Sequence, residues 1–216
     1  MAAAWKLCAL ALAFTISLLG PVRHADATPM AHLVLHSEPG DFIGAGGDFD
    51  ITYTPANSQL FSSFAFDFGL PAPAEVQFVL GTVTCCSDNT FALLSFGTQA
   101  LGIPIVPGHY PDAERAAFAS PGHPGLDVSF QNRGCNTVAG TFDVTQAVFS
   151  AAAQTATGSP IERFSASFEQ HCEGFAPALT GSFAYSAFGA AVPEPATWLL
   201  VLAALPLLAR RALRTS

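Results

Sequence analysis

The sequence predicts an all-β fold, an antiparallel two-sheet sandwich of jelly-roll type, and three observations lead to this prediction. Apolar and polar residues alternate with period 2 at many places between residues 28 and 190, and helical periodicity is scarce there. Clusters of Gly, Pro, Asn and Asp separate the alternating segments. Short strands with one apolar face each must pair those faces, and two antiparallel sheets do so. We expect an N-terminal signal helix and a short C-terminal transmembrane helix to flank this body.

Several segments show the alternation clearly. In residues 48–54, Phe49, Ile51 and Tyr53 share one face, while acids and threonines take the other. In residues 64–68, three phenylalanines line one side, which we assign to the core. The other alternating segments are residues 141–145, 164–169 and 183–187, and further apolar runs are residues 33–35, 76–80 and 91–96.

The segment from Gly102 to Gly125 interrupts this series, because it contains five prolines. Proline cannot donate a hydrogen bond to a sheet, and it fixes its own backbone φ angle. We therefore expect a long loop here, with Tyr110 exposed in it. Loops of this length are often functional or mobile.

Residues 1–27 have the composition of a secretion signal. Lys6 supplies a positive charge, residues 7–19 form an apolar run of 13, and a Gly-Pro pair ends it. Ala25 and Ala27 flank one aspartate in the small-x-small form that signal peptidase accepts. The run is too short for a typical membrane span. We therefore predict that signal peptidase cleaves after Ala27 and that residues 28–191 form the exported body.

Residues 192–216 differ from the body as strongly as the signal does. The motif Pro193-Glu194-Pro195 precedes a 14-residue apolar stretch, and a basic cluster follows it, at Arg210, Arg211 and Arg214. A helix of 14 residues is about 21 Å long, which makes it a marginal span of a hydrocarbon core of about 30 Å. The arginines hold that end in the cytoplasm by the positive-inside rule. The prolines keep the motif extended and accessible to a protease.

This ordered arrangement of motif, short helix and arginines resembles the PEP-CTERM sorting signal of Gram-negative bacteria. The resemblance implies that a membrane transpeptidase-like enzyme, exosortase, recognises Pro193, Glu194 and Pro195. It also implies transient anchoring in the inner membrane by the tail, followed by a place in the cell envelope or outside the cell. Species with this signal often make exopolysaccharide, which the resemblance implies as a partner.

The charge of the body argues against nucleic-acid binding. Between Thr28 and Pro195 there are three arginines, no lysine and fifteen acidic residues, so the net charge is −12 with histidines neutral. Nucleic-acid binding depends on Lys and Arg to neutralise phosphates. An acidic surface of this kind keeps a protein soluble, and divalent cations bridging it to anionic polymers are the second interpretation.

Four cysteines, which allow three pairings, remain after signal removal. We favour a Cys135–Cys172 disulfide, because both residues flank strand-like segments, with Cys85 and Cys86 bridged to each other. The former would close a loop of about 38 residues and stabilise the fold by up to about 4 kcal/mol in the chain-entropy model. The sequences around Cys135 and Cys172 also resemble a pattern in secreted bacterial β domains, which implies export and a β fold.

Calcium is the best of the candidate ligands. Glu38, Asp41, Asp48 and Asp50 cluster around a Gly-rich turn, and Ca²⁺ is bound by carboxylate and backbone carbonyl oxygens. Asp48 and Asp50 would share one strand face, about 7 Å apart. The motif is not an EF-hand loop, so the alternative that these acids are only solvated stays open. No other cofactor is expected.

These observations favour a non-enzymatic, envelope-sorted surface or matrix protein. The alternative is a glycan- or calcium-binding module. Both tryptophans of the chain fall in the terminal segments, however, so the body has few exposed aromatic side chains on which a sugar could stack. A secreted hydrolase ranks third, because the chain has no Gly-x-Ser-x-Gly motif.

Overall fold

The computed structural model describes residues 28–84 and 89–189. These residues form ten strands, two 3-10 turns and one short helix. In chain order they are β1 (Met30–Ser37), β2 (Asp48–Tyr53), β3 (Leu60–Phe66), β4 (Glu75–Gly81), β5 (Ala92–Gly97), η1 (Gln99–Leu101), β6 (Gly108–Arg115), η2 (Ala116–Phe118), β7 (Gly125–Phe130), β8 (Val138–Phe149), α2 (Ala151–Thr157), β9 (Ile161–Cys172) and β10 (Ala178–Ser186).

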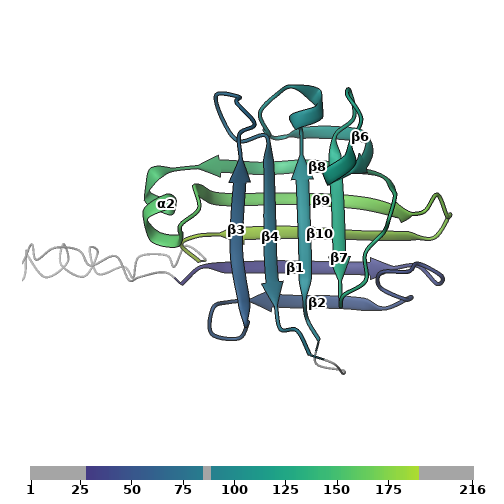
Figure 1. The fold of residues 1–216 in the computed structure, drawn as a ribbon. Coiled ribbons are helices and arrows are strands. Elements are labelled where there is room, and N and C mark those ends of the chain that lie inside the picture. Colours follow the sequence, from purple (N-terminus) through teal and green to yellow (C-terminus); the bar gives the residue numbers. More distant parts are fainter. Residues whose placement is uncertain (1–27, 85–88, 190–216) are drawn as a thin grey trace, which may run out of the picture.

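Hydrogen bonds join all ten strands in one sheet, in the order β2-β1-β10-β9-β8-β6-β7-β5-β4-β3. Every neighbouring pair is antiparallel except β6 and β7, which pair in parallel only at Glu114–Gly125 and Arg115–Leu126. The sheet folds over at this short junction, so that β3, β4, β5 and β7 form a layer that crosses the other strands (Figure 1). The all-β prediction is confirmed.

The connectivity differs from the predicted jelly roll. Strands that follow one another in the chain are mostly neighbours in the sheet, as in β3-β4-β5 and β8-β9-β10. Short hairpin connections produce this arrangement, whereas a jelly roll needs Greek-key crossings. The pairing also gives one continuous sheet. The predicted signal and transmembrane helices, in residues 1–27 and 192–216, lie outside the described residues. Within the described ranges, no helix is long and apolar enough to cross a membrane.

The core lies between the two layers and is rich in phenylalanine. Phe78 of β4 packs against Phe183 of β10 and Phe164 of β9, with ring centroids 4.6 and 5.6 Å apart. Phe96 of β5 lies 5.2 Å from the same Phe164 ring. Aromatic pairs at these distances stabilise a core beyond their buried area. They connect strands that are distant in sequence, so they hold one layer against the other.

Strand β3 presents its phenylalanines to the side opposite to the one predicted. Phe64 and Phe66 are 44% and 42% exposed, and their rings stack at 6.4 Å on the outer face. The inward positions are instead Phe61, Ser63 and Ala65. The Ser63 hydroxyl donates a hydrogen bond to the Tyr185 hydroxyl at 3.3 Å. Because β3 is an edge strand, this inner face meets the end of β10 rather than the centre of the core.

The Pro-rich segment was predicted to be a loop, but it contains β6 and η2. Pro111 is accommodated in β6 because the register shifts between Tyr110 and Ala113 at a bulge, where Asp112 has a φ angle of +54°. Tyr110 is buried rather than exposed, with its ring stacked on Phe142 at 4.8 Å, and its hydroxyl donates to the Val106 carbonyl at 2.7 Å. The bulge explains how a proline-containing strand can pair with β8.

Candidate functional site

The sorting and cleavage residues predicted from the sequence lie outside the described residues. They are Ala25, Ala27, Pro193, Glu194, Pro195, Arg210, Arg211 and Arg214. The second predicted cysteine pair, Cys85 and Cys86, also lies outside them.

The predicted disulfide between Cys135 and Cys172 is confirmed, with Cα atoms 5.0 Å apart. Cys172 is the last residue of β9 and lies opposite Val138, the first residue of β8. Cys135 lies three residues before that strand. Both cysteines are buried. The bond therefore ties the segment that enters β8 to the end of its neighbouring strand.

The structure does not bring the four predicted calcium ligands together. The buried Asp41 accepts hydrogen bonds from the Ser37 hydroxyl and from the Gly44 N–H, both at 2.8 Å. Glu38 accepts from the Ala178 N–H at 2.9 Å. In the described part of the chain, no group of three or more His, Cys, Asp or Glu residues could hold a metal ion. Asp41 and Glu38 therefore organise the β1–β2 connection and attach it to β10.

The other two predicted ligands pair with histidines of the neighbouring strand. Asp50 lies 2.7 Å from His32, and Asp48 is hydrogen bonded to His36. The same kind of pairing recurs on the outer surface, at His109–Asp143 (2.8 Å), His171–Glu169 (3.1 Å) and His123–Glu114 (3.9 Å). Because the body has no lysine, several of its carboxylates pair with histidines instead.

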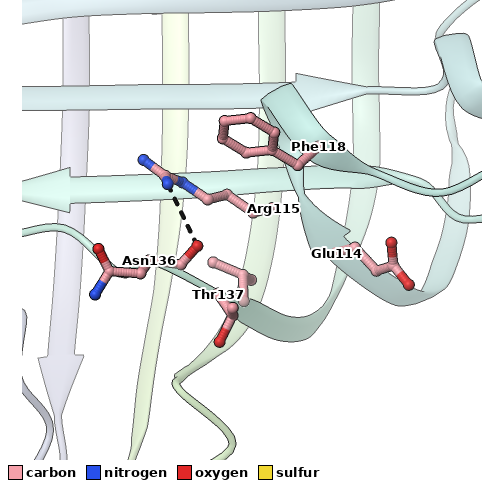
Figure 2. A pocket seen from close by; sticks show the side chains of 6 residues that line it. Glu114, Arg115, Phe118, Asn136 and Thr137 are labelled. Atoms are coloured by element: carbon pink, nitrogen blue, oxygen red, sulfur yellow. Dashed lines mark hydrogen bonds between the residues drawn. The ribbon is translucent and has the colours of Figure 1, made fainter.

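An open groove of about 570 Å³ lies at the end of β6 (Figure 2). One wall is formed by the end of β6 and by η2, and the other by the segment that enters β8. Sequence analysis predicted none of its lining residues, which are Glu114, Arg115, Phe118, Asn136, Thr137 and Val138.

Arg115 is the centre of this groove. Its Nε–H donates to the nearly buried carboxylate of Asp127 at 3.0 Å, and its Nη1 donates to the Asn136 carbonyl at 3.3 Å. The guanidinium carbon lies 5.2 Å from the centre of the Phe118 ring, as expected for a cation–π contact. Phe118 is 72% exposed. The ion pair fixes the arginine, and the arginine in turn supports an aromatic ring that faces solvent.

Two carboxylates hold the walls of the groove. Glu173 accepts from the Asn136 N–H at 2.5 Å and from the Thr137 hydroxyl at 3.1 Å, and the backbone hydrogen bond is the main reason that its pKa is lowered. Glu114 accepts from the Ser120 N–H at 2.7 Å, which lowers its pKa as well. Both groups therefore remain charged at neutral pH and keep their loops in place.

The groove combines an exposed aromatic face with polar groups of several kinds around it. An aromatic ring, a guanidinium, a hydroxyl and an amide can together hold a polar ligand that has one apolar face. The sequence contained one signal for this site. Arg115 is one of only three arginines in the body and lies three residues before a phenylalanine in the Pro-rich segment.

Comparison with known proteins adds no relative to these observations. No protein-family model, no curated protein and no solved structure matches this chain.

Proposed function

We propose that this chain is an exported protein that is sorted to the cell envelope by its C-terminal signal and acts there as a non-enzymatic surface or matrix component. The observation that carries the proposal is the Cys135–Cys172 disulfide in the core of the β body. Disulfides persist in oxidising compartments outside the cytosol and are rare inside it. The signal at residues 1–27 supplies the route to such a compartment, and the tail at residues 192–216 supplies the sorting step.

The partners follow from the two terminal segments. Signal peptidase removes the first segment after Ala27, and an exosortase-type membrane enzyme processes the second at Pro193-Glu194-Pro195. Exopolysaccharide is the matrix component that the body would meet after release. In this role the body catalyses no reaction.

Mass spectrometry of the mature protein from its native cells tests this proposal. We expect an N-terminus near Thr28, a C-terminus near the Pro-Glu-Pro motif and an oxidised Cys135–Cys172 pair. Glu194→Gln, or replacement of Arg210, Arg211 and Arg214, should leave the uncut form in the inner membrane. Glu162→Gln is the matched control, because it removes one carboxylate from the body. Recovery of the intact chain from the cytosol with reduced cysteines would overturn the proposal.

We propose as a second candidate that the groove beside Arg115 binds a glycan. The specific observation is the exposed Phe118 ring, which Arg115 contacts through its guanidinium. Sugars present an apolar face of C–H groups and a rim of hydroxyls. The Phe118 ring can stack on the apolar face of a sugar, and the Thr137 hydroxyl and the Asn136 amide can form hydrogen bonds with its hydroxyl groups.

Glycan-array binding by the mature protein tests the second candidate. Phe118→Ala should abolish selective binding, and Thr137→Ala should weaken it. Phe42→Ala is the matched control, because Phe42 is also an exposed phenylalanine but lines none of the groove. Binding that survives Phe118→Ala, or that Phe42→Ala removes equally, would refute this site.

We also propose that the two layers of the sheet form a β-sandwich. Its support is the aromatic core shared by the crossed layers, as in the contact of Phe78 with Phe183. An experimental structure would test this, since a barrel that also pairs β2 with β3 would contradict it.

A further inference from the structure

A second hollow, of about 280 Å³, lies on the outer face of the larger layer, at the ends of β1, β8, β9 and β10. Two rows of paired residues cross these strands. One row runs through Met30, Ser186 and Arg163, and the other through His32, Ala184, Ser165 and Gln146. Ser186, Ala184 and Ser165 of the central strands have small side chains, and larger side chains such as Met30, His32, Gln146 and Arg163 surround them. The hollow is therefore a trough whose floor is made of serine and alanine.

Among the described residues, the lining of the trough contains no carboxylate, although Asp50 and Glu162 contact the lining residues His32 and Arg163. The segment from Thr28 to Pro195 has fifteen acidic residues and three arginines, and one of those arginines, Arg163, lines the trough. In the portion that the structure describes, its guanidinium contacts one carboxylate, that of Glu162 at 3.4 Å, which leaves other N–H groups of the guanidinium for a ligand. Arginine donates several hydrogen bonds in a geometry that matches phosphate oxygens.

Other lining groups can also donate hydrogen bonds. The Ser165 hydroxyl and the Gln146 amide lie in the same cross-strand row, with Gln146 directly opposite Ser165 in the pairing of β8 with β9. The His32 imidazole lies at the far side and is hydrogen bonded to Asp50 at 2.7 Å. An anion in the trough would thus meet a guanidinium, a hydroxyl and an amide from two adjacent strands.

Apolar groups and the course of the chain indicate what kind of anion would fit. Met30 and the partly exposed Phe188 lie at one end of the trough, and Gly189 lines it as well. Ala196, where the apolar stretch of the tail begins, comes seven residues after Gly189. An extended chain of this length spans at most about 25 Å. While the tail is inserted, Gly189 at the edge of the trough therefore lies within about this distance of the start of the membrane segment.

We propose that this trough binds the phosphate group of a membrane phospholipid. Arg163, Ser165 and Gln146 would contact the phosphate oxygens, and Met30 and Phe188 would contact the glycerol and the first carbons of the acyl chains. This inference rests on the proposed insertion of the tail. Its consequence is that the body docks on the membrane in one orientation, with the root of the tail toward the lipid.

Calorimetry on the unprocessed chain without its signal, residues 28–216, held in a phosphate-free amphipathic polymer, tests this proposal. The probes are dihexanoyl phosphatidylglycerol below its micelle concentration and inorganic phosphate. We expect saturable binding of the lipid. Arg163→Gln should weaken it about tenfold or more, because a charge-assisted contact is lost. The matched control is Arg133→Gln, since Arg133 is a body arginine outside the trough, and it should change the affinity little.

A second variant separates binding from folding. Ala184→Leu adds bulk to the exposed floor of the trough, so it should abolish lipid binding while the unfolding temperature stays near that of the parent protein. Equal lipid binding by the parent and Arg163→Gln proteins would overturn the proposal. So would inorganic phosphate binding as tightly as the lipid, because the site would then recognise free phosphate. Processing of the tail is read separately by mass spectrometry, so a failure of sorting is distinguishable from a failure of lipid binding.

Discussion

The side-chain amide of Gln170 is hydrogen bonded in both directions to the backbone of Val128. The Val128 N–H donates to Gln170 Oε1 at 2.8 Å, and Gln170 Nε2 donates to the Val128 carbonyl at 2.9 Å. Strand β7 has β5 on one side, but on the other its pairing with β6 ends at Leu126. The fully buried glutamine of β9 thus takes the place of a missing strand at the fold-over of the sheet, where unpaired backbone groups would be costly.

Replacing Gln170 by leucine should destabilise the protein by roughly 2 to 6 kcal/mol. The variant leaves a buried N–H and a buried carbonyl without partners, and each such group costs about 1 to 3 kcal/mol. Urea unfolding of the mature protein measures the change. Gln146→Leu is the control, because Gln146 lies on the outer face of β8 and its replacement should cost little. Equal costs for the two variants would contradict this role for Gln170.

Removing the disulfide by replacing Cys135 and Cys172 with serine should lower the free energy of unfolding by up to about 4 kcal/mol, because the unfolded chain gains freedom. Urea unfolding with and without a reductant measures this. The reductant should destabilise the parent protein and leave the serine variant unaffected. A parent protein that does not respond to the reductant would argue against the bond, and a serine variant that still responds would indicate a second bridge, such as Cys85–Cys86.

Two phenylalanines of adjacent strands should respond very differently to truncation. Phe78→Ala removes a fully buried ring that contacts Phe164 and Phe183, so it should cost about 3 to 5 kcal/mol. Phe64→Ala removes a ring on the outer face of β3 and should cost less than about 1 kcal/mol while improving solubility. Thermal unfolding and a solubility assay compare them. A large loss of stability in Phe64→Ala would mean that β3 faces the other way.

Burial raises the pKa of Glu75, which is only 9% exposed. Because the pKa of this carboxyl is higher in the folded than in the unfolded protein, the folded state is favoured while the carboxyl is protonated. This contribution to the free energy of unfolding is lost as the pH rises from the unfolded pKa through the folded pKa. Glu75→Gln should therefore raise the unfolding temperature at pH 7, with the gain disappearing toward pH 4. Thermal unfolding across this range measures the effect.

Glu114→Gln provides a control of opposite sign for that experiment. Hydrogen bonding to Ser120 lowers the Glu114 pKa, so its contribution is present at neutral pH and is lost as the pH falls. The variant should be less stable than the parent protein at pH 7. The same pH profile for both variants would contradict the two assignments.

Alternation of apolar and polar residues predicted the strands whose apolar face is buried. It gave the wrong inward face where the apolar residues of a strand lie on the outside. Phe49 and Ile51 of β2 are partly buried and pack on the core as expected. In β3 the same period-2 pattern is present, but the apolar set that it marks lies outside, because periodicity groups residues by face without assigning the face to the core. Strand β6 was missed because a bulge accommodates its proline.

The groove was not predictable from local sequence. Its two walls, at residues 114–118 and 136–138, are about 20 residues apart and meet only because Glu114 of β6 lies opposite Ala139 of β8. The disulfide could be predicted because each cysteine lies beside a recognisable strand. The four predicted calcium ligands were grouped by nearness in sequence, yet strand pairing gives each a separate partner, such as Asp50 with His32.

The pairing of Met30 with Ser186 joins the first and last strands of the body. Strand β1 lies between β2 and β10, so one of its edges has no partner until the final strand has been made. Contacts between such distant parts of a chain form slowly. The β body therefore completes its sheet only after almost all of it has left the ribosome. A chain that stops before residue 178 would keep an open strand edge prone to aggregation.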